Sequence, residues 1–569
     1  MKRIVELFLF IVTCLFGMTG CIKEIDPQSS SVTQRQAANA PGAFDNFVRG
    51  TTNTLAGTFI YNRSQERPWD YGYASFFLIR DVMGNDIALE DHGSEWYTTW
   101  YTCGTGLGPT YAVCQLPWTC YYGWVKNCNT VIGLAGERVS DNQQGGLGIA
   151  YAMRAMYYMD LARMFATKTY GKDTSAITVP LVLETSSLSE LPSNPRVTNN
   201  VMWKHILADL EQAEKFLGNY QRPDVYTPDL SVVYGLKARA YLTMENWAKA
   251  EEYAKKAQEK YTLMNEEEYT SRTSGFNTPN SSWMFGLTFK STDDNILVND
   301  GDCSWGSQMI LEVQASGCGY AANYGTPKRI DYHLYQTIPP TDFRKKCFLD
   351  FEIDELLKDT EAGPQKAFEA LKAYSDVPDQ ILKTIQGLKS KSAGGLQVKF
   401  RPGGGEHTNQ YKAFTVAVPL MRVEEMMLIE AEAAGMQDET RGIALLTKFA
   451  KSRDPHYKYG THSSDKYDSD YATGFQNEVW WQRRVELWGE GFAMFDIKRL
   501  DKSVIRSYPN TNHPEGYRWN RDSYGSNEGN LYPNWMDFCI VNTEVNYNTA
   551  CVNNPTPLRP TNDSSEYNW

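Results

Sequence analysis

The chain has 569 residues and a formal net charge of −12 at pH 7. Because nucleic-acid binding needs clustered basic residues, this acidic balance argues against a nucleic-acid partner. Only 7 histidines are present and no two cysteines have CxxC spacing, so the sequence indicates neither a metal site nor a cofactor.

The N-terminus predicts secretion followed by lipid attachment. A basic start, "MKR", precedes the apolar run "LFLFIVTCLFGM", which is typical of a signal peptide and too short for a spanning helix. "MTGC" resembles the lipobox of bacterial lipoproteins, which implies a signal peptide over 1–20 and lipidation of Cys21. The polar stretch 21–42 then predicts a flexible tether. A cleaved signal peptide without a lipid is the alternative.

Nine cysteines remain once Cys14 is lost with the signal peptide and Cys21 is lipidated. An odd number leaves at least one free thiol. Cys539 and Cys551 are close enough in sequence to form a disulfide in an oxidising compartment, but their spacing leaves the pairing open.

Helices are predicted through the first half of the mature chain. Apolar residues recur there at steps of three and four, which is the period of an amphipathic helix. Gly218 favours the end of the fourth helix, because glycine is common at helix C-termini. The predicted spans are 71–84, 116–136, 145–166 and 198–218.

A helix–turn–helix repeat follows at 234–261. Small residues such as Gly235 and Ala238 allow close helix packing, and "TMEN" makes the turn, as in a tetratricopeptide repeat. A second helix pair is predicted at 417–435 and 439–454, and a further helix is predicted at 483–500.

Long helix-poor stretches separate these elements, and their aromatic content argues against disorder. The sequence therefore predicts a mostly α fold, with tetratricopeptide-like helix pairs as the scaffold, long aromatic-rich loops and a few short strands. The loop stretches are 85–117, 270–345, 391–416 and 500–569.

Two carboxylates and an arginine stand out in "RRVELWGEGFAMFDIKRL", residues 483–500. Arg483, Glu486 and Glu490 share neighbouring faces of the predicted helix, so they suggest an acid/base pair, a metal cradle or a structural ion pair. No histidine follows at the spacing of a di-iron site, and no HExxH, GxSxG or Walker sequence occurs in the chain. The structural ion pair is the favoured interpretation, and no catalytic residue is predicted.

Aromatic residues in two polar, glycine-containing loops predict a ligand surface. Sugars bind where an aromatic face meets the C–H face of a ring and polar groups take the hydroxyls. The alternative is that each aromatic residue only holds its loop on the scaffold. The candidates are Asp91, Trp96, Tyr97 and Trp100 in 85–117, and Trp305, Tyr320 and Tyr324 in 270–345.

The order of several motifs resembles the SusD/RagB family of Bacteroidetes outer-membrane lipoproteins. After the lipobox come "RDVMGND", "WTCYYGWVKNCNTVI", "ILADLEQAEKFL", the repeat at 234–261, "VPLMRVEEMMLIEAEA", "RRVELWGEGFAMFDIKRL" and "FCIVNTEVNYNTACVNN". This resemblance implies one SusD-like domain over 43–569, with ligand-binding insertions near 85–117 and 270–345.

The resemblance also implies a function. Such proteins are lipid-anchored in the outer membrane, face the cell exterior and cap a SusC-like TonB-dependent transporter. We therefore expect a non-catalytic protein that captures oligosaccharide or polysaccharide and delivers it for import. A RagB-like peptide-binding protein is the main alternative, and a secreted hydrolase is a weaker one.

Overall fold

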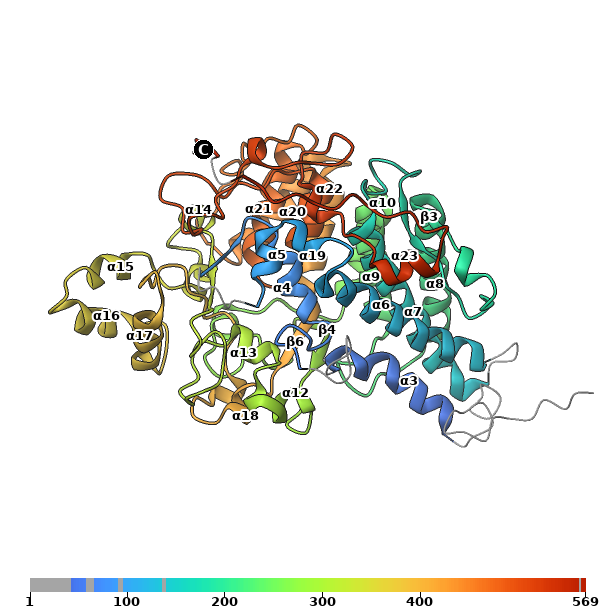
Figure 1. The fold of residues 1–569 in the computed structure, drawn as a ribbon, viewed down its shortest axis with the longest axis horizontal. Helices are drawn as coiled ribbons and strands as arrows, with labels where there is room; N and C mark the ends of the chain where they lie inside the picture. Colours follow the sequence, from blue (N-terminus) through green and yellow to red (C-terminus); the bar gives the residue numbers. More distant parts are fainter. Residues whose placement is uncertain (1–41, 58–65, 91–95, 136–139, 562–563) are drawn as a thin grey trace, which may run out of the picture.

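The computed structural model describes residues 42–57, 66–90, 96–135, 140–561 and 564–569. Cys21, Asp91, the signal peptide and nearly all of the tether lie outside these residues. Helices dominate and strands are short, which confirms the predicted mostly α fold (Figure 1). Within the described ranges, no helix is both long and apolar enough to cross a membrane.

A stack of helices forms the scaffold. Helix α7 packs on α6 and α8, α9 packs on α10, and α10 packs on α19, which also contacts α20 and α21. Gly235 brings α9 close to β6, because a Cβ at this position would overlap the Met421 sulfur. The scaffold helices are α3 (Ala43–Asn53), α6 (Ala112–Ala135), α7 (Asp141–Phe165), α8 (Asn199–Leu217), α9 (Leu230–Thr243), α10 (Trp247–Gln258), α19 (Val423–Gly435), α20 (Glu439–Lys451) and α21 (Gly474–Glu486).

The strands form three separate antiparallel pairs. They are β1 (Ile87–Leu89) with β5 (Lys328–Ile330), β2 (Ile177–Pro180) with β3 (Arg196–Thr198), and β4 (Trp283–Thr288) with β6 (Ala417–Arg422). The pairing of β6 corrects the prediction of a helix over the whole of 417–435. Its first six residues contain Pro419 and pair with β4, so the helix begins only at Val423.

Short helices lie between the scaffold helices and strands. Three of them, α15 to α17, form a protruding lobe with its own apolar core around Ile353, Leu371 and Ile381 (Figure 1). The short helices are α4 (Ser75–Val82), α5 (Thr98–Thr102), α11 (Glu266–Tyr269), α12 (Asp294–Leu297), α13 (Trp305–Met309), α14 (Tyr332–Thr337), α15 (Glu352–Leu357), α16 (Gly363–Leu371), α17 (Pro378–Gly387), α18 (Gln410–Ala413), α22 (Ala493–Leu500) and α23 (Asn542–Tyr547).

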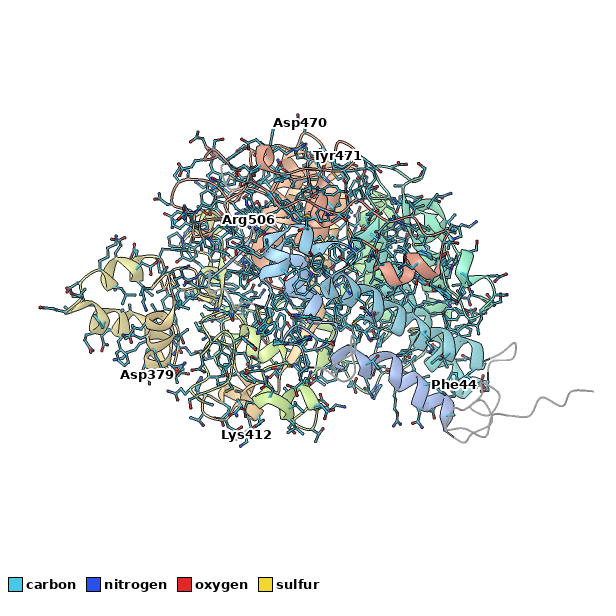
Figure 2. The ribbon with its side chains drawn as sticks, in the orientation of Figure 1. Phe44, Asp379, Lys412, Asp470, Tyr471 and Arg506 are labelled. Carbon is cyan, nitrogen blue, oxygen red and sulfur yellow. The ribbon has the colours of Figure 1, made fainter. Side chains whose placement is uncertain are left out.

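A buried arginine holds the C-terminal stretch on the body. Arg506, labelled in Figure 2, lies in the interior. It donates hydrogen bonds to the carbonyl oxygens of Val82 (2.8 Å), Tyr101 (3.0 Å) and Gly84 (3.1 Å). Because each of the three guanidinium nitrogens has a backbone acceptor, none of them is buried without a partner. A helix-poor segment is thereby fixed against α4 and α5.

The stretch 483–500 is two helices, not the single predicted one. Helix α21 ends at Glu486 and α22 begins at Ala493. Between them Gly489 and Gly491 have φ of 75° and 83°, a left-handed conformation that glycine adopts without steric cost. A Cβ at Gly491 would also lie 2.6 Å from Phe77 Cδ1, so the packing around the break also requires glycine at this position.

Glu486 and Glu490 lie in a buried network of charged side chains. Glu486 accepts hydrogen bonds from Arg453 (3.0 Å), Arg422 (3.2 Å) and Arg344 (3.3 Å). Glu490 accepts from Arg422 (2.8 Å) and Lys399 (2.7 Å). No more than 3% of any of these side chains is exposed. The network connects the ends of β6 and α21 to Arg453 just after α20 and to the three segments that carry Arg344, Lys399 and Glu490.

Arg483 does not belong to this network. Its Nε donates to Asp496 of α22 at 2.7 Å, which corrects its predicted grouping with Glu486 and Glu490. Because the chain turns at Gly489 and Gly491, the start of α22 brings Asp496 to the Arg483 side chain. Among the described residues no cluster of His, Cys, Asp and Glu is arranged to hold a metal ion.

The nine cysteines among the residues that the structure describes are buried free thiols. Cys539 and Cys551 therefore do not form the bridge that their spacing allowed. Burial raises the pKa of both thiols to about 11, so neither is a reactive thiolate near neutral pH.

The network generates a prediction about stability. Burial alone would raise the pKa of Glu486, but Arg453, Arg422 and Arg344 hold it far below its ordinary value of 4.5. Glu486→Gln removes this charge and takes one carboxylate partner from each of three buried guanidinium groups, which keep only Glu424, Glu490 or Asp342. We expect the free energy of unfolding, measured by urea denaturation at pH 7, to fall by about 3–5 kcal/mol.

The pH dependence gives a second readout. A carboxylate with a lowered folded pKa stabilises the protein above its unfolded pKa and loses this effect as pH falls. The difference between wild type and Glu486→Gln should therefore shrink below pH 4.5. Glu369→Gln removes an exposed partner of Lys372 and is the control, with a change within about 0.5 kcal/mol. Equal effects of the two substitutions would contradict the role of the network.

Candidate functional site

The pairing of β1 with β5 brings the two predicted loops together. Leu89 at the end of β1 lies opposite Lys328 at the start of β5. In an antiparallel pair, the segment leaving one strand and the segment entering the other meet at the same end. Trp96 follows β1, and Tyr320 and Tyr324 precede β5, so residues more than 200 positions apart become neighbours.

Three of the predicted residues form one partly exposed aromatic cluster. The ring centroids of Trp96 and Tyr320 are 6.1 Å apart and their planes meet at 83°. Tyr320 and Tyr324 are 5.2 Å apart at 49°. Trp96 is 36% exposed and Tyr324 37%, while Tyr320 is half-buried between them. We call Trp96, Tyr320 and Tyr324 the aromatic cluster.

Asp302 fixes the loop that carries Tyr320. Its carboxylate accepts hydrogen bonds from the Gly319 N–H (2.6 Å) and the Ser307 hydroxyl (3.1 Å), and Ser307 Oγ accepts from the Tyr320 N–H (3.0 Å). Burial raises the pKa of Asp302 to about 6, although the bonds from Gly319 and Ser307 oppose this shift. The backbone under the cluster is thus held by a carboxylate that is largely ionised at neutral pH.

Helix α17 of the lobe supports the same loop from the other side. Thr384 Oγ1 donates to the Ala322 carbonyl at 2.6 Å, and Gln380 Nε2 donates to Asn323 Oδ1 at 3.3 Å. The Asn323 amide in turn donates to the Cys318 carbonyl at 2.8 Å. Side chains from two elements therefore hold the loop in one conformation, so the cluster is preorganised for a ligand.

Three other predicted residues are not on this surface. Tyr97, Trp100 and Trp305 are 0%, 2% and 1% exposed, which corrects their assignment as platforms for a ligand. The Tyr97 hydroxyl hydrogen-bonds that of Tyr71 at 2.6 Å. These residues have the role considered as the alternative, since they hold their loops on the scaffold.

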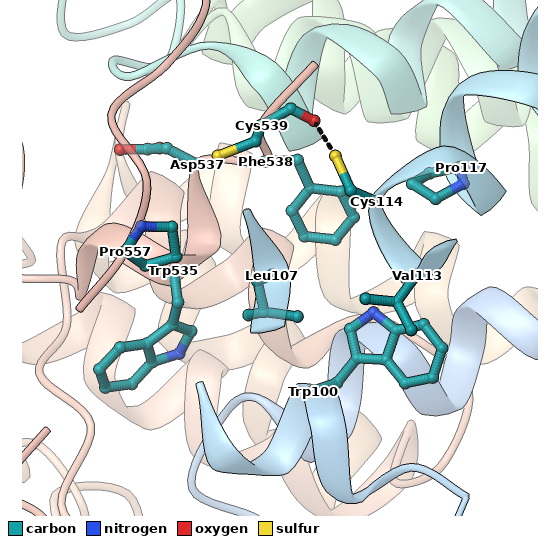
Figure 3. A pocket seen from close by; sticks show the side chains of 10 residues that line it. All are labelled: Trp100, Leu107, Val113, Cys114, Pro117, Trp535, Asp537, Phe538, Cys539 and Pro557. Atoms are coloured by element: carbon teal, nitrogen blue, oxygen red, sulfur yellow. Dashed lines mark hydrogen bonds between the residues drawn. The ribbon is translucent and has the colours of Figure 1, made fainter. Parts of the chain in front are cut away.

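The surroundings of the two tryptophans explain their burial. Trp305 packs edge-on against Phe400, with centroids 5.2 Å apart. Trp100 packs edge-on against Trp69 at 5.9 Å and lines a cavity of about 20 Å³ beside Leu107 and Phe538 (Figure 3). A cavity of this size has room for about one water molecule and not for a sugar ring.

Two polar residues near the cluster were not predicted. The Tyr411 hydroxyl donates to Asp300 Oδ1 at 2.9 Å, and the charge of Asp300 acts on Asp302 and Tyr324. Asn299 and Asp300 have φ of 49° and 54°, the left-handed region that Asn and Asp tolerate best among non-glycine residues. Their sequence offers no signal of this contact, because Tyr411 is more than 100 positions away.

Comparison with known families decides the relationship. Residues 85–242 match a family model described as starch-binding and associating with the outer membrane, and residues 245–556 match the model of the SusD family. The second match alone covers more than half of the chain. The chain belongs to the SusD family.

Solved structures show the same fold. A SusD-like carbohydrate binding protein from Bacteroides vulgatus is 21% identical, with a TM-score of 0.64 over 90% of this chain and 97% of that chain. Surface glycan-binding protein A from Bacteroides thetaiotaomicron, solved with laminarihexaose, is 16% identical, with a TM-score of 0.61 over 90% and 99%. No curated protein matches the chain.

Trp96 is partly exposed and Trp305 is buried, so replacing each by alanine should change the free energy of unfolding by different amounts. Trp305→Ala leaves a large buried cavity, so we expect a loss of about 3–5 kcal/mol in the free energy of unfolding. Trp96→Ala removes a partly exposed ring and should cost less than about 1 kcal/mol. Urea denaturation of both variants measures the difference. A loss at Trp96 as large as that at Trp305 would mean that Trp96 also serves the core.

Proposed function

We propose that this protein binds a glycan at the aromatic cluster and passes it to an outer-membrane transporter. One observation carries the proposal: three aromatic side chains converge on a partly exposed, preorganised surface in a SusD-family chain. The fold relatives described as carbohydrate-binding support it.

The geometry of the cluster suits a sugar chain. Trp96 and Tyr320 meet nearly at a right angle, so a pyranose that stacks on one ring touches the edge of the other. The exposed Tyr324 extends the surface, and the exposed Asp300 carboxylate, whose Oδ1 accepts the Tyr411 hydroxyl, has a second oxygen that can accept a sugar hydroxyl. An open surface of this kind accepts the interior of a polymer as well as its end.

Binding at such a site should be weak. Each aromatic contact contributes about 0.5–1.5 kcal/mol beyond area burial. Three rings with a few hydrogen bonds give about 4–6 kcal/mol, which corresponds to a Kd from millimolar to tens of micromolar. Weak binding suits a protein that must release its ligand, and repeated units of a polymer raise the apparent affinity.

We further propose that the protein is not an enzyme. The charged side chains singled out in 483–500 lie in the buried network and satisfy one another, so they offer no acid or base to a substrate. Peptide capture remains the competing function, because an aromatic surface also accepts apolar peptide side chains. A ligand screen that contains both classes separates the two.

Affinity electrophoresis tests the glycan site. Native gels would contain starch, laminarin, mannan or xylan, and retardation would identify the polymer that binds. We expect Trp96→Ala and Tyr324→Ala each to weaken retardation by that polymer about 2- to 12-fold in Kd. Tyr547→Ala, which removes an exposed tyrosine of the distant helix α23, is the control and should bind normally (Figure 1).

Two outcomes would contradict this proposal. Normal retardation of a Trp96→Ala/Tyr324→Ala double variant would place the site elsewhere. Binding of peptides by the wild type, together with no retardation in any of the four polysaccharides, would favour the peptide function.

The anchor and the partner are part of the same proposal. Lipidation of Cys21 would hold the protein at the outer membrane, and the tether 21–42 would let the domain move against a SusC-like transporter. A starch-binding, outer-membrane-associated family model over residues 85–242 supports this location.

Cys21→Ala tests the anchor. Without the acceptor thiol, palmitate labelling should disappear and the protein should leave the membrane fraction, because acyl chains supply the membrane affinity. The wild type, purified from outer membranes in mild detergent, should bring a large β-barrel protein with it. Unchanged labelling of the variant would contradict lipidation, and wild type recovered alone would contradict the transporter partnership.

A further inference from the structure

A second cleft lies between the protruding lobe and the body. Its volume is about 760 Å³, within the range of about 300–1,000 Å³ that is typical of ligand sites. One wall is α14 with the loop 510–512, and the other is α15 with Tyr374 and Ser392. In Figure 1 the lobe of α15 to α17 projects from the body beyond α14.

The body wall of the cleft is rigidly held. Asp331 caps α14 by accepting the Leu334 N–H at 3.0 Å, and its carboxylate is also bound by Tyr508. Asn512 accepts the Tyr332 N–H at 2.8 Å and donates to the Ile330 carbonyl at 2.9 Å. The start of α14 is therefore fixed from both sides.

The lobe wall is equally constrained. The Asp354 carboxylate accepts the Ser392 hydroxyl at 2.7 Å and the backbone N–H groups of Ala393 and Gly394. A Cβ at Gly394 would overlap the Phe351 ring, so glycine lets this ring lie against the backbone. Hydrogen bonds and close packing therefore hold both walls of the cleft in place.

Aromatic side chains line the cleft. The Phe351 ring lies 4.9 Å from Tyr332, at 84°, and 5.2 Å from Tyr335, at 59°. Tyr332, Phe351 and Tyr374 are half-buried, and each presents part of its side chain to the cleft. Half-buried rings of this kind can receive the C–H face of a sugar.

Several polar side chains at the rim have no protein partner. Among the residues that the structure describes, the side chains of Gln336, Glu352 and Asn510 make no hydrogen bond, and all three are exposed. They offer amide donors, amide acceptors and a carboxylate acceptor around the aromatic rings. This combination matches a hydroxyl-rich ligand.

The basic groups at the cleft are already engaged. Lys345 donates to the Ile338 carbonyl at 2.7 Å and lies 4.4 Å from the Tyr335 ring, while Lys346 pairs with Glu266 at 2.6 Å. Carboxylates outnumber lysines among the lining residues. An anionic polymer would therefore meet repulsion, and a neutral sugar would not.

We propose that this cleft is a second carbohydrate-binding site, which takes a neutral oligosaccharide segment. The ligand class follows from the aromatic walls, the unpartnered polar groups and the lack of free basic groups. The site is separate from the aromatic cluster, and its existence does not rest on the function proposed for that cluster.

Hydrogen exchange read by mass spectrometry tests this site on the intact domain. The probes are maltohexaose, cellohexaose, laminarihexaose and mannohexaose. We expect at least one of them to slow exchange in peptides covering 332–355 and 508–514. This protection should persist in Trp96→Ala/Tyr324→Ala, whose peptides covering 317–326 should lose theirs.

A reciprocal variant completes the design. Gln336→Ala/Glu352→Gln alters only side chains that make no hydrogen bond within the described protein, so it should fold normally. We expect it to weaken the protection at 332–355 about fivefold for each hydrogen bond lost, and to leave 317–326 unchanged. The exposed substitution Glu369→Gln is the matched control.

The outcomes separate the two sites. Absence of protection at 332–355 with all four probes would overturn the second site, whatever happens at 317–326. Protection at 332–355 that Gln336→Ala/Glu352→Gln does not weaken would also overturn it. Protection at 332–355 with none at 317–326 would support the second site and contradict the function proposed for the aromatic cluster.

Discussion

Glu486 is surrounded by three guanidinium groups in the interior, and much of the architecture depends on how that charge is balanced. Arg422, Arg453 and Arg344 come from the end of β6, the turn after α20 and the segment before the lobe. Each would be a costly buried charge alone. Because they share one carboxylate, the helical scaffold and the loops must assemble together. Such a network favours a single arrangement of its elements over alternatives that separate the charges.

The aromatic cluster, to which we assign ligand binding, exists only because the short strands β1 and β5 pair. Pairing of β1 with β5 involves three residues on each strand, yet it places Trp96 beside Tyr320. Asp302 and helix α17 then fix the loop that carries Tyr320. A rigid loop loses little conformational entropy on binding, so even a few aromatic contacts can hold a sugar.

The lobe of α15 to α17 has two structural roles. Through Gln380 and Thr384 it supports the loop of the aromatic cluster, and through Phe351 and Tyr374 it lines the second cleft. Two weak sites on one domain can engage distant parts of the same polymer, which raises the overall affinity without a tight site. This arrangement would favour long chains over short ones.

The sequence by itself determined the helical scaffold, because helices depend on local period and on small residues such as Gly235 that permit close packing. It also indicated the loops that carry aromatic residues. It could not show that Trp96 is exposed while Trp100 and Trp305 are buried, since all three lie in polar, glycine-containing stretches. The burial of the latter two depends on contacts with distant residues such as Trp69 and Phe400.

Other features were decided only by the tertiary structure. The helix predicted over 483–500 is broken by two glycines, and Arg483 finds its partner, Asp496, beyond the break. The partners of Glu486 lie 33 to 142 positions away, so no local pattern reveals them. Exposure and charge pairing depend on contacts between distant segments, and these exist only once the chain has folded.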